Sequence, residues 1–84
     1  MPTIVSFLDN NKIYNPIMDI TQRISKNIRR LRKERKLTQE VLAGLAGLHP
    51  KYIGMIERCE RQITVVSLEK ISNALNVGLI DLVE

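Results

Sequence analysis

The stretch from Thr38 to Arg58, TQEVLAGLAGLHPKYIGMIER, joins two short helical patterns through a glycine. The apolar residues of both patterns recur at the spacing of one helix face: Leu42, Ala43, Ala46, Ile53 and Ile56. Thr38 can cap the first helix, because its hydroxyl can accept a hydrogen bond from a free backbone N–H. Gly47 can adopt the left-handed conformation of a helix end, and Pro50 suits the first turn of the next helix. This spacing predicts a helix-turn-helix.

Several residues at fixed offsets in this region resemble the phage-repressor-like (XRE-type) DNA-binding family. They are Leu37-Thr38-Gln39-Glu40, Leu42-Ala43, Gly47-Leu48, Tyr52-Ile53 and Ile56-Glu57-Arg58. The continuation resembles the small controller proteins that regulate restriction–modification operons, and it comprises Arg61, Leu68, Lys70-Ile71 and Ala74-Leu75-Asn76-Val77. The resemblance covers residues 20 to 83. It implies an all-α, five-helix repressor-like domain that binds DNA through its helix-turn-helix.

A chain of 84 residues is long enough for one small domain with a modest core. We therefore expect a helix-turn-helix DNA-binding domain at 19–84 and an N-terminal extension at 1–18. The sequence has no apolar run of about eighteen residues and no secretory-signal pattern, so no membrane span or membrane partner is expected. The single cysteine, Cys59, excludes an intramolecular disulfide and suits a reducing cytoplasm.

The extension differs in composition from the rest of the chain. Its β-prone residues flank the turn-prone cluster Asp9-Asn10-Asn11, so it could form a small hairpin, although a flexible arm fits equally well. A lone hairpin is marginal in water and needs a surface to pack on. Val41 and Leu45 predict such a surface, because they share a helix face that should point away from the core. The alternative is that Leu45 alone packs on the first helix and the extension stays loose.

A basic helix is expected to begin at Asp19, which forms a capping-box pattern with Gln22. Its apolar stripe has helical spacing and consists of Ile20, Ile24, Ile28 and Leu31. Around this stripe, against the single acid Glu34, lie basic residues: Arg23, Lys26, Arg29, Arg30, Arg32, Lys33, Arg35 and Lys36. Such a surface either binds phosphates or is simply solvated. Beside a helix-turn-helix we favour phosphate binding, with Arg30 and Lys36 as contacts.

Two further helical patterns complete the chain. Thr64 can cap a fourth helix, and Asn76 suits its left-handed end. The apolar positions of this helix are Leu68, Ile71 and Leu75. Residues 77–83 predict a fifth helix or turn, which must pack on this domain or on a partner because it is too short to be stable alone.

One small domain offers few base contacts, so we expect a homodimer on a pseudo-palindromic operator. The domain core cannot hide all the apolar residues at the end of the chain. The dimer interface is therefore predicted at Leu79, Ile80, Leu82 and Val83.

Base contacts are expected from the second helix of the motif, which enters the major groove in this fold. The candidates there are Pro50, Lys51, Tyr52 and Met55. Lys51 can donate to guanine, whereas Pro50 and Met55 can only make apolar contacts, for example to a thymine methyl group. The resemblance to controller proteins implies a further base contact from Arg61, in the following loop.

Phosphate contacts are expected mainly from Gln39, which opens the first helix of the motif. Further candidates lie at the end of the second helix and in the loop beyond it: Arg58, Gln62 and Thr64. The repressor family also pairs an arginine with a glutamate at positions that match Arg32 and Glu57. This resemblance implies an internal ion pair that holds the recognition helix at a fixed angle.

Other chemistries are not supported by the sequence. His49 is the only histidine and has no second ligand nearby, which argues against a metal site and leaves helix capping or a phosphate contact. Cys59 stands where the family usually has glycine or asparagine. No catalytic pairing or phosphate loop can be assembled, so we expect neither an enzyme nor a cofactor.

These observations predict a transcriptional regulator with double-stranded DNA, a second copy of itself and RNA polymerase as partners. Its closest functional model is the controller protein of a restriction–modification operon. The alternative is an antitoxin-type repressor that uses the same DNA-binding fold and also binds a protein toxin, with the N-terminal extension as the feature serving that role.

Overall fold

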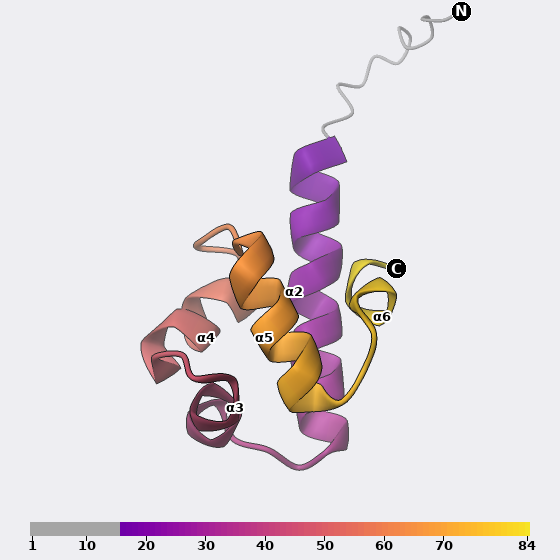
Figure 1. Ribbon diagram of the computed structural model, residues 1–84. Helices are drawn as coiled ribbons and strands as arrows, with labels where there is room; N and C mark the ends of the chain where they lie inside the picture. The colour runs from indigo at the N-terminus through magenta and orange to yellow at the C-terminus, as the bar shows by residue number, and fades with distance from the viewer. Residues whose placement is uncertain (1–15) are drawn as a thin grey trace, which may run out of the picture.

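The computed structural model describes residues 16–84, with side chains from Ile20 onward. This part of the chain forms five helices: α2 (Pro16–Glu34), α3 (Gln39–Ala46), α4 (Pro50–Glu57), α5 (Val65–Leu75) and α6 (Leu79–Val83). All of its regular structure is helical, which confirms the all-α prediction (Figure 1). The hairpin or arm predicted for the extension lies, up to residue 15, outside the described residues.

The first helix starts earlier than predicted. It begins at Pro16 rather than at Asp19, so residues 16–18 are part of α2. Proline is favoured in the first turn of a helix, where its missing N–H costs no hydrogen bond. The capping-box pattern at Asp19 therefore falls inside the helix and does not mark its start.

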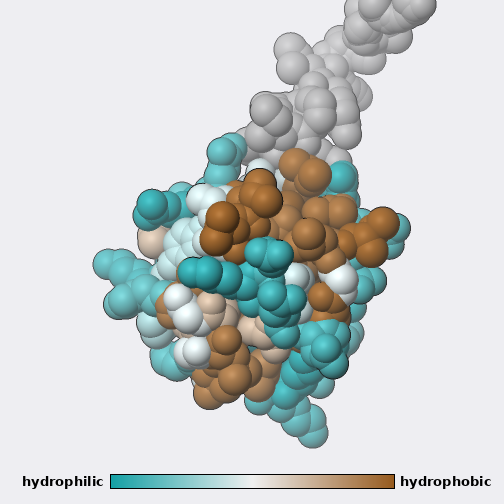
Figure 2. All heavy atoms as spheres, viewed as in Figure 1, coloured by the Kyte–Doolittle hydropathy of each residue, from teal (hydrophilic) through white to brown (hydrophobic). Residues whose placement is uncertain are grey.

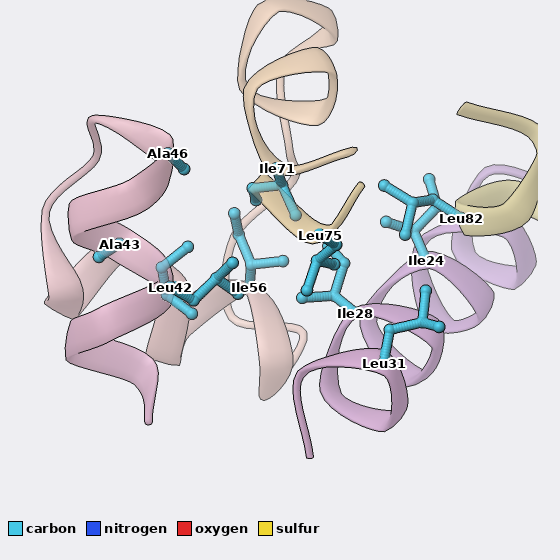
Figure 3. Packing of buried hydrophobic residues seen from close by; sticks show 11 residues of the cluster. Ile24, Ile28, Leu31, Leu42, Ala43, Ala46, Ile56, Ile71, Leu75 and Leu82 are labelled. Atoms are coloured by element: carbon cyan, nitrogen blue, oxygen red, sulfur yellow. The ribbon is translucent and has the colours of Figure 1, made fainter. Parts of the chain in front are cut away.

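The core lies between α2 and the helix-turn-helix. Figure 3 shows Ile28 of α2 next to Leu75 of α5, with Leu42 and Ile56 of the motif on the other side. All four side chains are buried, and they belong to one cluster with further apolar residues: Ile24, Leu31, Ala43, Ala46, Ile53, Ile71 and Leu82. Helices α2 to α5 contribute residues of their predicted apolar stripes, and α6 adds Leu82, so one small core holds all five helices.

Local caps fix where the helices of the motif begin and end. The Thr38 hydroxyl accepts a hydrogen bond from the Val41 N–H at 3.0 Å, and Gly47 ends α3 with φ of 70°. His49 caps α4, because its Nδ1 accepts from the Lys51 N–H at 3.1 Å. The turn between the two helices is therefore set by its own sequence, as predicted.

The same logic holds for α5. Thr64 accepts a hydrogen bond from the Ser67 N–H at 3.0 Å, and Asn76 ends the helix in the left-handed conformation with φ of 59°. Both roles were expected from residue type, since threonine favours the cap and asparagine tolerates positive φ.

The short helix α6 packs on α2, on the side opposite to α3 and α4 (Figure 1). Two side chains of α2 fix its end: Asn27 donates to the Leu82 carbonyl at 2.8 Å, and Arg23 donates to the Val83 carbonyl at 3.0 Å. Leu82 is 0% exposed within its own chain, so its assignment to a dimer interface is wrong. The reason is that the short helix turns this residue into the core.

A further surface feature concerns two aliphatic side chains of α3. Val41 and Leu45 of α3 are both exposed, so Leu45 does not pack on the first helix.

In the part of the chain that the structure describes, no helix combines the length and the apolar character that crossing a lipid bilayer requires.

Candidate nucleic-acid interface

The recognition helix α4 is held in place by a buried ion pair. The Arg32 guanidinium of α2 donates from Nε and Nη2 to the two carboxylate oxygens of Glu57, at 2.7 and 2.9 Å. The side chain of Glu57 is only 1% exposed. Its hydrogen bond raises the pKa of Arg32 above the ordinary value, in spite of burial. The pair expected from the resemblance is thus present, and it joins the end of α4 to α2.

The same carboxylate orients Gln39. The Gln39 Nε2 donates to Glu57 Oε1 at 3.1 Å, so the first residue of α3 is tied to the last residue of α4. Gln39 remains half exposed. The Gln39 amide nitrogen carries two N–H donors; one binds Glu57, and the other can donate to a ligand. A phosphate contact by Gln39 would therefore come from a side chain that is already fixed in position.

The outward ridge of α4 consists of Lys51 and Met55, which are four residues apart and therefore neighbours. Lys51 is exposed, and Met55 is half buried. Pro50, also half buried, lies in the first turn of the helix. This ridge has a single charged side chain, as the sequence predicted.

On the side of α4 that faces α3, Arg58 lies beside the ridge. It donates from Nε and Nη2 to Glu60, each at 3.0 Å, and both side chains are 53% exposed. These hydrogen bonds raise the pKa of Arg58 and lower the pKa of the Glu60 carboxyl, because they stabilise the charged form of each group. The sequence analysis did not identify Glu60 as a partner of Arg58. An acidic residue two positions after an arginine was the sequence signal that could have indicated this pair.

On the other side of α4, Tyr52 supports a second arginine. The Arg61 guanidinium lies over the Tyr52 ring, 5.7 Å from its centroid, which is within the range of a cation–π contact. The Tyr52 hydroxyl accepts from the Thr64 N–H at 3.5 Å. Tyr52 therefore acts as a platform for Arg61 and an anchor for the start of α5, and the outward ridge is flanked by an arginine on each side.

The remaining predicted residues divide into two groups. Gln62 and Thr64 are exposed in the loop and at the cap after Arg61, and Lys36 is exposed in the turn that leads into α3. Arg30 lies elsewhere: it contacts Asn27 at 3.4 Å and pairs with Glu34 at 3.2 Å, on the side of α2 that carries α6. It does not join the surface around α4, because the helix turns it away from α4.

Comparison with known proteins agrees with this geometry. Residues 28–82 match the helix-turn-helix family HTH_3. Control protein C.SmaI of Serratia marcescens is 42% identical over 62 residues, covering 74% of this chain and 74% of the relative. Control protein C.MunI of a Mycoplasma species is 38% identical over 65 residues, covering 76% of this chain and 88% of the relative.

A solved structure is similar as well. The restriction–modification controller protein C.AhdI of Aeromonas hydrophila superposes with a TM-score of 0.72 at 34% identity, covering 74% of this chain and 94% of that protein. The family match spans the core except for Ile24, together with the ion pair and both arginines that flank α4. The chain belongs to the helix-turn-helix family HTH_3 of XRE-type DNA-binding regulators, and it resembles the controller proteins of restriction–modification systems.

Proposed function

We propose that this chain is a sequence-specific transcriptional regulator that binds a pseudo-palindromic operator as a homodimer and controls a restriction–modification operon. The observation that carries the proposal is the fixed recognition helix, with its outward ridge flanked by Arg58 and Arg61. Helix α4 is anchored at its end by Arg32 and Glu57, so its outward residues are held in one orientation before DNA arrives. Such preorganisation reduces the entropy that binding must spend.

Base readout is assigned to Lys51 and Arg61. Both are exposed and neither has an acidic partner among the described contacts, so their donors are available for guanine. Pro50 and Met55 add apolar contacts. Tyr52 supports Arg61 and therefore contributes to readout through that side chain rather than through a base contact of its own.

Phosphate binding is assigned to the residues that surround the ridge: Gln39, Arg58, Lys36, Gln62 and Thr64. Contacts of this kind position a regulator on the duplex without reading its sequence. They also make binding strongly dependent on salt, because each neutralised phosphate releases counterion.

The dimer surface is assigned to α6. Leu79 and Ile80 are 44% and 61% exposed, and Val83 is half buried beside them. Figure 2 shows apolar side chains gathered over this part of the molecule and over the start of α5. Neighbouring exposed aliphatic side chains of this kind favour an interface with another protein surface, and a second copy is the partner that a palindromic site requires.

RNA polymerase remains a predicted partner for the case in which the regulator activates transcription. The alternative, an antitoxin-type repressor, would bind a protein toxin as well as DNA. Co-purification of a toxin, or a toxin-like reading frame beside the gene, would support the antitoxin. A neighbouring endonuclease and methyltransferase pair would support the controller.

Selection of bound sites from random double-stranded DNA tests the proposal directly. We expect an enriched motif with two related half-sites whose centres lie about one helical turn apart. Failure to enrich any sequence would overturn sequence-specific regulation. Enrichment of one unrepeated half-site would leave DNA recognition in place and overturn the dimer.

A further inference from the structure

Gly54 occupies an unusual place on the recognition helix. It lies on the side of α4 that faces α3 and is nevertheless buried. What covers it is two polar side-chain ends. A Cβ added to Gly54 would lie 3.1 Å from Arg58 Nη1 and 3.3 Å from Gln39 Oε1. Both contacts are tighter than ordinary van der Waals distance, so a methyl group at this position would require these two side-chain ends to shift by a few tenths of an ångström.

Each of these side chains is held over Gly54 by a carboxylate. Glu57, itself paired with Arg32, accepts from Gln39 Nε2 at 3.1 Å. Glu60 accepts from the Nε and Nη2 of Arg58. The hydrogen bonds to Glu60 do not use Arg58 Nη1, the atom nearest to a Cβ on Gly54, so Nη1 is able to donate to a ligand. Arg58 thereby lies back along α4 toward the start of α3.

We propose that Gly54 is a positioning residue of the DNA interface, and that the absence of a side chain there lets the Arg58 guanidinium lie back over α4, where it donates to one backbone phosphate. This inference rests on the proposed DNA binding. Side chains on a helix lean toward its N-terminus, so the Arg58 guanidinium lies beside position 54, where a Cβ would crowd it. Arg58 Nη1 can donate the charge-assisted hydrogen bond that a phosphate oxygen accepts. The Gln39 oxygen beside it is an acceptor and makes no such bond.

Close packing of the helix backbones is the competing reason for a glycine. It does not apply here, because the three atoms nearest to the added Cβ all belong to side chains, of Arg58 and Gln39. The fold therefore has room for an alanine. The chain also offers a matched control: Gly44, in the middle of α3, has nothing within 4 Å of an added Cβ.

The test compares Gly54→Ala and Gly44→Ala with the wild type, using thermal unfolding and fluorescence anisotropy on the selected operator. Alanine is the better helix former, so both variants should keep or raise Tm. We expect Gly44→Ala to bind DNA like the wild type, and Gly54→Ala to bind about tenfold more weakly, the equivalent of one weakened charge-assisted hydrogen bond. Loss of affinity without loss of stability is a result that a purely structural glycine would not produce.

A double-mutant cycle then shows how Gly54 acts. In an Arg58→Ala background, Gly54→Ala should change the affinity by less than about twofold, because the side chain it displaces is gone. An equal loss in both backgrounds would mean a direct clash with DNA and would overturn the inference. The inference would also be overturned if Gly54→Ala bound DNA within about twofold of the wild-type affinity. Absence of any DNA binding by the wild type would instead overturn the proposed function itself.

Discussion

Arg32 and Glu57 are joined by two hydrogen bonds, from Nε to Oε2 at 2.7 Å and from Nη2 to Oε1 at 2.9 Å. The pair connects the first helix of the domain with the last residue of the recognition helix. Because Gln39 shares the same carboxylate, one buried acid sets the mutual orientation of α2, α3 and α4. The angle at which α4 is presented therefore depends on this contact as well as on apolar packing.

Glu57→Gln should lower the free energy of unfolding by about 3 kcal/mol, because it leaves the Arg32 charge without its anion in a mostly buried site. Urea unfolding measures the change. Glu34→Gln is the control: it breaks an exposed pair with Arg30, and its expected cost is below about 0.5 kcal/mol. Equal effects of the two substitutions would contradict the central role of Glu57.

Cys59→Gly should stabilise the domain. Cys59 has φ of 60°, a conformation that costs a residue with a side chain roughly 1–2 kcal/mol. Glycine removes that strain but raises the entropy of the unfolded chain, so the expected net gain is about 0.5–1 kcal/mol. A urea midpoint that stays the same or falls would show that the left-handed conformation is not strained at this position.

Sequence patterns captured the local features of the fold better than its boundaries. Thr38, Gly47 and Thr64 were assigned correctly because capping depends on residues close together in the chain. The start of α2 was misplaced because a capping-box pattern competed with the proline at position 16. The burial of Leu82 could not be read from five helical residues, since so short a segment does not define which face is inside.

In the candidate interface, too, the sequence predicted residue types but not the contacts between distant segments. Residue types identified Lys51 and Arg61 as candidates, but the contact of Arg61 with Tyr52 depends on the path of the loop after α4. The pairing of Arg58 with Glu60 depends on it too. Sequence alone could not place Arg30, because the basic residues surround α2 and only the packing of α6 shows which of them face away from the motif.

Arg58→Ala should weaken binding to all DNA sequences by a similar factor and reduce the slope of log K against log salt by about 1. The matched control is Arg30→Ala, which removes the same charge from the side of α2 that carries α6. We expect little change in slope from the control. Titrations at several salt concentrations make the comparison, and identical slopes for both variants would refute the phosphate contact of Arg58.

Arg61→Ala should instead relax the preference for one base pair in each half-site, at a cost of roughly 1–3 kcal/mol for the best sequence. Tyr52→Leu removes the platform beneath Arg61 while keeping an apolar side chain, so it should weaken the same preference to a smaller extent. Repeating the site selection with both variants checks this. A uniform loss over all sequences would identify Arg61 as a phosphate contact.

Sequence-specific DNA recognition is tested most directly by the ratio of two dissociation constants at physiological salt. One is measured for the selected operator and the other for a scrambled duplex of equal length and composition. A regulator that reads bases through a fixed recognition helix should bind its operator at least about 10³-fold more tightly, with two chains per duplex. A ratio near one would contradict sequence-specific recognition, however tightly the chain bound either duplex.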